Sequence, residues 1–335
     1  MTTGADRARM AEAMAAAASV RGLTSPNPWV GAVVVTPAGA AFTGATRPPG
    51  GAHAEVEALA AAGDGAAGGT LYVTLEPCAH HGRTGPCADA VVAAGVRRVV
   101  VGIEDPDPLV AGQGIARLRQ AGVDVAVGVL AEEIADQLAP YLTHRRTGRP
   151  WVTLKLAATL DGRTAAADGS SRWITGPEAR ADAHRLLATH DAVLVGAGTV
   201  RADDPALTVR DAPGRDPVRV VLGTAPADAR VHPALELHGP LPAVLDDLGR
   251  RGILSVLVEG GATVAHAFHA GGLVDRYVVY LAPALMGGSD GPGLFAGPGA
   301  ATIADAWRGR LLGVARLGDD LRVELAPVRV LAEVG

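Results

Sequence analysis

Four residues of the first third of the chain are ordered as metal-dependent hydrolysis requires. His53 and Glu55 stand at the start of a helical pattern, Cys78 follows a proline, and Cys87 opens another helical pattern. One imidazole and two thiolates can hold a tetrahedral zinc ion and leave its fourth position to water. We therefore expect His53, Cys78 and Cys87 to bind Zn2+. We expect both cysteines near helix N-termini, which favours thiolates over thiols.

The same order is typical of zinc deaminases that act on bases and nucleosides. Zinc lowers the pKa of a bound water to about 7, so that hydroxide is available to attack the ring carbon bearing an amino group. Glu55 is the expected catalytic residue, carrying the water proton to the leaving ammonia. A lone His-x-Glu pair is usually helix surface, and a lone Pro-Cys pair is usually a turn. The complete order, which uses both cysteines of the chain, favours the metal site.

The loop between the cysteines departs from the general deaminase pattern. Eight residues separate Cys78 from Cys87, where two are usual. His80 and Arg83 of this loop are candidates for binding an anionic group of the substrate, and the alternative is a surface loop with incidental charges. The wide spacing and a net charge of -5 disfavour a nucleic-acid base deaminase, which would need a basic groove.

Strand and helix patterns alternate in the part of the chain that carries this motif, which predicts a layered α/β fold. Helical patterns cover 7–21, 53–62, 87–94 and 112–121, and strand patterns cover 30–36, 71–75, 99–103 and 123–129. The polar, basic segment 143–150 ends in proline and is the best candidate for a linker. We therefore expect a zinc deaminase domain over 1–145 and a second α/β domain over 150–335.

The second half shows another α/β series with a weaker chemical signal. Strands are expected over 151–157, 192–195, 218–222, 254–258, 277–282 and 321–325, helices over 177–188, 241–251 and 262–270, and a loop over 287–299. Gly260 and Gly261 stand between a strand and a helix, where backbone amides can approach a phosphate. Gly196 and Gly198 follow a strand similarly, but Arg201 stands where a dinucleotide fingerprint needs glycine, which disfavours a Rossmann domain.

Composition places the chain among globular proteins with two domains. Its 335 residues are 48% hydrophobic and 19% charged. Apolar runs are of strand length, so we expect no membrane span and no membrane partner. The N-terminal helical pattern lacks the apolar core of a signal peptide, and we expect a cytoplasmic protein.

Several motifs, in order along nearly the whole chain, resemble the bifunctional riboflavin-biosynthesis deaminase/reductase family. In the first half these are Ser25-Pro-Asn-Pro28, His53-Ala-Glu55, Thr74-Leu-Glu-Pro77, Pro77-Cys-Ala-His-His-Gly-Arg-Thr-Gly-Pro-Cys87 and Asp105-Pro-Asp-Pro108. In the second half they are Leu154-Lys-Leu156, Leu160-Asp-Gly-Arg163, Ser171-Arg-Trp-Ile-Thr175, Gly196-Ala-Gly-Thr-Val200, Ala202-Asp-Asp-Pro205, Leu207-Thr-Val-Arg210 and Val258-Glu-Gly-Gly261.

The resemblance implies a cytidine-deaminase-like domain followed by a dihydrofolate-reductase-like domain, with Zn2+ and NADPH as cofactors. It implies that a diaminopyrimidinone ribosyl phosphate, a small phosphorylated aminopyrimidine, is deaminated and that its ribosyl group is then reduced to ribityl. The implied cofactor-binding residues are Ala157, Trp173, Thr199, Asp203, Thr224, Gly260 and Gly261. The implied substrate-binding residues are Asn27, His80, Arg83, Lys155, Ser171, Leu207, Arg210 and Glu259. The family forms oligomers, so a homo-oligomer is also implied.

Several positions differ from the family pattern. Leu187 stands where an arginine that contacts substrate is usual, Gly223-Thr224 replaces Asp-Ser, and the segment 222–241 is short. In the first half, Thr46, Ala79, Asp107 and Ala139 replace the usual His, Ser, Asn and Asn. Two alternatives therefore stay open: a paralogue that deaminates a related aminopyrimidine in another pathway, and a C-terminal half that is a weak or inactive reductase serving for binding or assembly.

Overall fold

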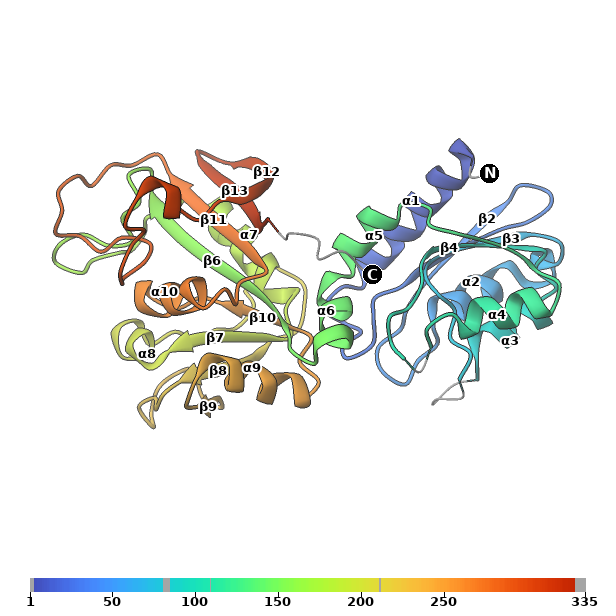
Figure 1. The fold of residues 1–335 in the computed structure, drawn as a ribbon, viewed down its shortest axis with the longest axis horizontal. Coiled ribbons are helices and arrows are strands. Elements are labelled where there is room, and N and C mark those ends of the chain that lie inside the picture. The colour runs from blue at the N-terminus through green and yellow to red at the C-terminus, as the bar shows by residue number, and fades with distance from the viewer. Residues whose placement is uncertain (1–2, 81–84, 109, 211, 329–335) are drawn as a thin grey trace. The chain divides into compact units, whose positions relative to one another are not determined.

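The chain divides into two compact units, Met1–Gly148 and Arg149–Gly335 (Figure 1). The structure is a computed structural model that describes residues 3–80, 85–108, 110–210 and 212–328. The division falls inside the segment 143–150 for which the sequence predicts a linker. This segment is not all loop, because helix α6 (Ala139–Thr147) runs almost to the division and buries Thr143.

A five-stranded sheet forms the centre of the first unit. Its strands are β1 (Gly31–Val35), β2 (Ala41–Ala45), β3 (Thr70–Leu75), β4 (Arg98–Ile103) and β5 (Asp124–Val127), in the order β2-β1-β3-β4-β5. Strand β1 is antiparallel to both neighbours, whereas β3, β4 and β5 are parallel. Parallel strands need crossover helices, and here these helices carry the functional residues.

Helices cover both faces of this sheet. Figure 1 shows α1 (Gly4–Ser19) and α5 (Ala131–Gln137) on one face, and α2 (Ala54–Ala62), α3 (Cys87–Ala93) and α4 (Gln113–Gln120) on the other. A short 3-10 helix (Gly63–Ala66) follows α2. The second face is therefore the one on which the helices beginning beside His53 and at Cys87 meet.

An eight-stranded sheet forms the centre of the second unit, in the order β12-β13-β11-β6-β10-β7-β8-β9. The strands are β6 (Trp151–Thr159), β7 (Ala192–Gly196), β8 (Val218–Leu222), β9 (Leu235–Leu237), β10 (Ser255–Val258), β11 (Arg276–Ala282), β12 (Gly309–Leu317) and β13 (Asp320–Pro327). The strands from β11 to β9 are parallel, and β13 and β12 continue the sheet antiparallel.

Two apolar cores cover the two faces of this sheet. On one face, α9 (Leu241–Arg250) and α10 (Ala262–Ala270) pack through residues such as Leu245 and Phe268. On the other, α7 (Pro177–Ala188) and α8 (Ala197–Asp203) pack through residues such as Leu187 and Val200. Strand residues alternate between the cores: Leu194 belongs to the first and Val193 and Val195 to the second. This alternation is the period-two pattern of a strand buried on both faces.

The sequence predicts most of these elements, and the bounds of α7, β8 and α10 are confirmed residue for residue. Elements without a predicted counterpart are β2, α5, α6, α8, β9, β12 and the short 3-10 helices Gly63–Ala66 and Ile303–Asp305. In the part of the chain that the structure describes, no helix is both long and apolar enough to cross a bilayer.

Candidate metal centre and reductase cavity

His53, Cys78 and Cys87 come together at the ends of three elements. His53 caps the N-terminus of α2, Cys87 is the first residue of α3, and Cys78 follows the carboxyl end of β3. Their ligand atoms all lie within 4.8 Å of one another. His53 Nδ1 is 3.1 Å from Cys87 Sγ and 3.7 Å from Cys78 Sγ. Ligands at zinc bond lengths would be about 3.6 Å apart at tetrahedral angles, so these residues fit the ion.

Both cysteines lie near a helix N-terminus, as the sequence predicts, but they reach it in different ways. Only Cys87 begins a helix, because the proline-containing segment after β3 leaves Cys78 in a loop. The Cys78 sulfur still reaches the N-terminus of α3, where it accepts a hydrogen bond from the Cys87 N–H at 3.4 Å. The backbone oxygen of Cys78 accepts another from Ala88. The loop is thus fixed against the helix that carries the other sulfur.

Electrostatic interactions within the cluster favour thiolate at Cys78. Hydrogen bonding with the Cys87 thiol, and further with His53, lowers the pKa of Cys78 to about 4. The pKa of Cys87 is raised, because its thiol donates to the Cys78 sulfur and is buried. The pKa of His53 is raised by its hydrogen bond with Cys78. A metal ion must displace the proton that Cys87 holds, which makes its binding dependent on pH.

Glu55 lies in the first turn of α2, beside this cluster. Its side chain is buried, and burial raises its pKa to about 7. The neighbouring Cys87 thiol lowers the pKa of Glu55 and so offsets a small part of this rise. A carboxyl group with a pKa near neutrality can both accept and return a proton at working pH.

Glu76 is a buried residue of this centre whose role the sequence analysis did not assign. Its carboxylate accepts hydrogen bonds from the backbone N–H groups of Asp105 (3.2 Å), Gly112 (2.9 Å) and Ile115 (3.0 Å). Glu76 therefore fixes the start of α4 and the segment before it against the segment that carries Cys78. A glutamate two residues before the Cys78 ligand, at the end of a buried strand, was the available sequence signal.

The other substrate-binding residues predicted in this unit are less defined. Asn27 is half-buried in a turn where its backbone pairs with Thr24. His80 is exposed. Among the residues that the structure describes, no hydrogen bond or ion pair joins Asn27 or His80 to the metal cluster. Arg83 lies outside the described residues.

The second unit contains a cavity of about 930 Å³. It lies where α7 and α8 meet the carboxyl ends of the parallel strands, which is where open α/β sheets bind ligands. The residues predicted from the resemblance that line it are Lys155, Ala157, Ser171, Trp173, Thr199, Asp203, Leu207, Arg210 and Glu259. They come from β6, the segment before α7, α8, the segment after α8 and the end of β10.

Three predicted cofactor-binding residues do not line this cavity: Thr224, Gly260 and Gly261. Gly260 and Gly261 precede α10, and the Gly261 N–H donates to Thr199 Oγ1 at 3.2 Å. The two glycines therefore adjoin Thr199, which lines the cavity. Thr224 follows β8, two strands from β10 in the sheet, and is exposed.

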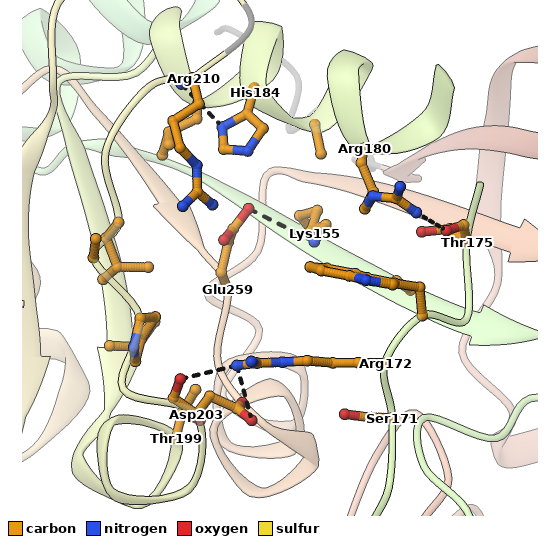
Figure 2. Close-up of a pocket in the computed structure, with 18 of the residues that line it drawn as sticks. Lys155, Ser171, Arg172, Thr175, Arg180, His184, Thr199, Asp203, Arg210 and Glu259 are labelled. Carbon is orange, nitrogen blue, oxygen red and sulfur yellow. Dashed lines mark hydrogen bonds and ion pairs between the residues drawn. The ribbon is translucent and has the colours of Figure 1, made fainter. Parts of the chain in front are cut away.

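Charged side chains form two sets in the cavity (Figure 2). Lys155 Nζ lies 3.7 Å from a Glu259 carboxylate oxygen. The Arg172 guanidinium lies 3.8 Å from the Asp203 carboxylate and donates to the Asp203 backbone oxygen at 2.9 Å. Lys155 and Arg172 are therefore paired with acids of the cavity itself.

The basic lining residues that were not among the predicted site residues are Arg172, Arg180, His184 and Arg230. Arg172 stands within the motif Ser171–Thr175, whereas no motif marks the other three. Spacing marks Arg180 and His184, because they and Leu187 follow one another at helical intervals on α7, so one face of α7 meets the cavity. Leu187, where the resemblance leads us to expect arginine, lines the cavity and packs in the core beneath it.

Comparisons with known proteins agree with both halves of this description. Residues 4–103 match the cytidine and deoxycytidylate deaminase zinc-binding region, and residues 150–323 match the RibD C-terminal domain. The riboflavin biosynthesis protein RibD of Escherichia coli (strain K12) is 40% identical over 96% of this chain and 99% of its own length. RibD of Mycobacterium tuberculosis (strain CDC 1551 / Oshkosh) is 46% identical over 91% of this chain and 93% of its own.

Two solved structures of relatives are similar to this chain over nearly its whole length. Acinetobacter baumannii RibD superposes with a TM-score of 0.90, at 40% identity over 97% of this chain and 99% of its own. A TM-score of 0.88 is found for a Thermotoga maritima protein described as a diaminohydroxyphosphoribosylaminopyrimidine deaminase/5-amino-6-(5-phosphoribosylamino)uracil reductase. It is 34% identical over 96% of this chain and 98% of its own. The expectations of a cytidine-deaminase-like zinc domain and a reductase domain are therefore confirmed, and the chain belongs to the RibD family of bifunctional riboflavin-biosynthesis enzymes.

Proposed function

We propose that this chain removes the 2-amino group of a 2,5-diamino-6-ribosylamino-pyrimidinone 5'-phosphate and then reduces the ribosyl group to ribityl with NADPH. The observation that carries the proposal is the convergence of His53, Cys78 and Cys87 beside a buried glutamate whose pKa is raised to about 7. The relatives at 40% and 46% identity favour this reaction over a paralogue's substrate.

In the first reaction His53, Cys78 and Cys87 would hold the zinc ion. The ion supplies the Lewis acidity that makes water nucleophilic at neutral pH. Glu55 accepts the proton that the water loses and delivers it to the amino group that leaves as ammonia. Burial suits Glu55 to both steps, because it brings the pKa of the carboxyl close to the working pH.

In the second reaction the cavity of the second unit holds substrate and cofactor side by side. NADPH supplies the hydride. Thr199, Asp203, Trp173 and Ala157 would orient the cofactor, while Lys155, Ser171, Leu207, Arg210 and Glu259 would hold the substrate. The volume of about 930 Å³ is within the range of small-molecule sites.

Ammonia release from the diaminopyrimidinone ribosyl phosphate tests the first reaction. We expect Glu55→Gln to lower the rate at least a hundredfold, because it removes the general acid and base, and to leave the bound zinc unchanged. Glu57→Gln is the matched control, since Glu57 lies two residues further along α2 and pairs with Arg47. The proposal would be contradicted if Glu55→Gln and Glu57→Gln lost the same fraction of the ammonia-release rate. It would also be contradicted if the protein released ammonia only from another aminopyrimidine. NADPH oxidation on the deaminated product separates an active reductase from an inert module.

A further inference from the structure

We propose that Arg180 of α7 binds the substrate's phosphate in the reductase cavity, on the side of His184 opposite Arg210. This proposal depends on the proposed function in one respect: it takes the substrate of the second unit to be a ribosyl phosphate. The supporting observation is the uneven distribution of charge pairs around the cavity.

The cationic side chains that line the cavity differ in whether a carboxylate pairs with them. Lys155 is paired with Glu259 and Arg172 with Asp203. Within the described ranges, Arg180, Arg210 and Arg230 have no carboxylate partner within 4.0 Å of their guanidinium groups. Three guanidinium groups without acids in one cavity make it suited to an anion, and a phosphate accepts hydrogen bonds from a guanidinium at two oxygens at once.

Other contacts hold the Arg180 side chain in place. Its guanidinium carbon lies 4.6 Å from the centroid of the Trp173 ring, over its face. One of its terminal nitrogens donates to the Thr175 backbone oxygen at 2.5 Å. The stacking and this single hydrogen bond orient the group while leaving other N–H donors without a protein acceptor among the described residues. A side chain oriented before the ligand arrives loses less conformational entropy when it binds.

The position of Arg180 favours the substrate over the cofactor as its ligand. Figure 2 shows Arg210, His184 and Arg180 in a row beneath α7, whereas Thr199, Asp203 and Arg172 lie across the cavity. His184 joins the row, because its Nδ1 lies 3.4 Å from the Arg210 backbone nitrogen, which donates to it. Thr199 in turn accepts from Gly261 at the start of α10, where backbone amides favour a cofactor phosphate. The α7 side is therefore left for the phosphate of the second ligand.

Substrates with and without the phosphate test the proposal in wild type and Arg180→Gln. We expect Arg180→Gln to raise KM for the phosphorylated compound about ten- to hundredfold, the effect of losing a hydrogen bond to a charged group. For the dephosphorylated compound we expect little change in KM, and kcat and the Kd for NADPH should stay within about twofold of wild type. Arg180→Lys keeps the positive charge but cannot donate to two phosphate oxygens from one planar group. Its KM for the phosphorylated compound should therefore lie between those of wild type and Arg180→Gln.

Arg185→Gln is the matched control, because Arg185 lies on the same helix but pairs with Asp182 and does not line the cavity. It should behave as wild type in every assay. Equal impairment of both compounds by Arg180→Gln would mean that Arg180 only supports Trp173 and would overturn the proposal. Weaker NADPH binding with unchanged substrate KM would overturn it as well.

Calorimetric titration with ribose 5-phosphate separates this proposal from the proposed function, because it needs no turnover. Wild type should bind ribose 5-phosphate more tightly than ribose, and Arg180→Gln should lose that preference. If wild type binds ribose 5-phosphate in this way but oxidises no NADPH, the reductase reaction is wrong while the phosphate site stands. If wild type does not distinguish the two sugars, the phosphate site is wrong.

Discussion

Thr199 Oγ1 accepts a hydrogen bond of 3.2 Å from the backbone N–H of Gly261, which joins the first turn of α8 to the N-cap of α10. Thr199 lines the reductase cavity and Gly261 does not. The hydroxyl therefore holds the start of α10, with its glycine pair, beside the cavity. The two segments come from neighbouring parallel strands, β7 and β10, whose carboxyl ends meet at the same edge of the sheet.

Thr199→Val should weaken NADPH binding while leaving deamination intact. Valine has the shape of threonine without the hydroxyl, so the Gly261 N–H loses its acceptor and the start of α10 is no longer held. Losing a hydrogen bond of this kind costs about 1 kcal/mol, or roughly a fivefold rise in the Kd for NADPH. Fluorescence titration with NADPH measures the change. Thr189→Val, at the C-terminus of α7 outside the cavity, is the control, and an equal effect there would contradict the assignment.

The metal ligands could be predicted from the sequence because their chemistry restricts residue type and order so strongly. Only two cysteines exist, and each stands beside a structural boundary, the end of a strand or the start of a helix. What could not be predicted is the way Cys78 reaches the start of α3 without belonging to a helix. That contact depends on the path of a loop, which hydrophobic periodicity does not report.

The reductase cavity was predicted only where the resemblance supplied motifs. Arg180 stands in no motif, and its place in the cavity depends on which face of α7 turns toward β6. Helix α8 was missed because Gly196 and Gly198, which cost helix stability, are typical of a turn. Packing of Val200 into the core overrides that local preference.

Gly114→Ala should disturb the zinc centre from a distance. A Cβ at this position would lie 1.8 Å from the backbone oxygen of Pro77, the residue before Cys78, so either α4 or the ligand loop must move. We expect less than full zinc occupancy and a loss of stability of about 1–3 kcal/mol, as in other overpacked cores. Metal analysis and urea unfolding measure these effects. Gly4→Ala, whose Cβ would meet nothing within 4 Å, should retain all its zinc.

Removal of zinc should separate the two activities. The metal cluster belongs to the first unit and every residue lining the reductase cavity belongs to the second. Dialysis against a chelator should therefore abolish ammonia release and leave NADPH oxidation on the deaminated substrate within about twofold of its original rate. Added zinc should restore deamination, except in Cys78→Ser. Parallel loss of both activities would show that the second unit depends on the metal.

Asp6→Asn should destabilise the first unit in a way that depends on pH. Asp6 is buried in α1, and the Arg98 guanidinium that donates to both its oxygens holds the pKa of the carboxyl well below its usual range. The ionised carboxyl therefore contributes stability above its unfolded pKa of about 4, and this contribution is lost as pH falls toward the folded pKa. We expect Asn to cost about 3 kcal/mol at pH 7.

The difference in the free energy of unfolding between Asp6→Asn and wild type should then narrow as the pH is lowered below about 4, because Asp6 takes up a proton there in the unfolded chain while the folded carboxyl stays ionised. Asp124→Asn is the matched control. Asp124 also faces Arg98, at 3.6 Å, but its side chain is 73% exposed, and exposed ion pairs contribute at most about 1 kcal/mol. If the difference in the free energy of unfolding between Asp6→Asn and wild type stayed constant from pH 7 to pH 3, the destabilisation would come from lost packing and not from the lost charge.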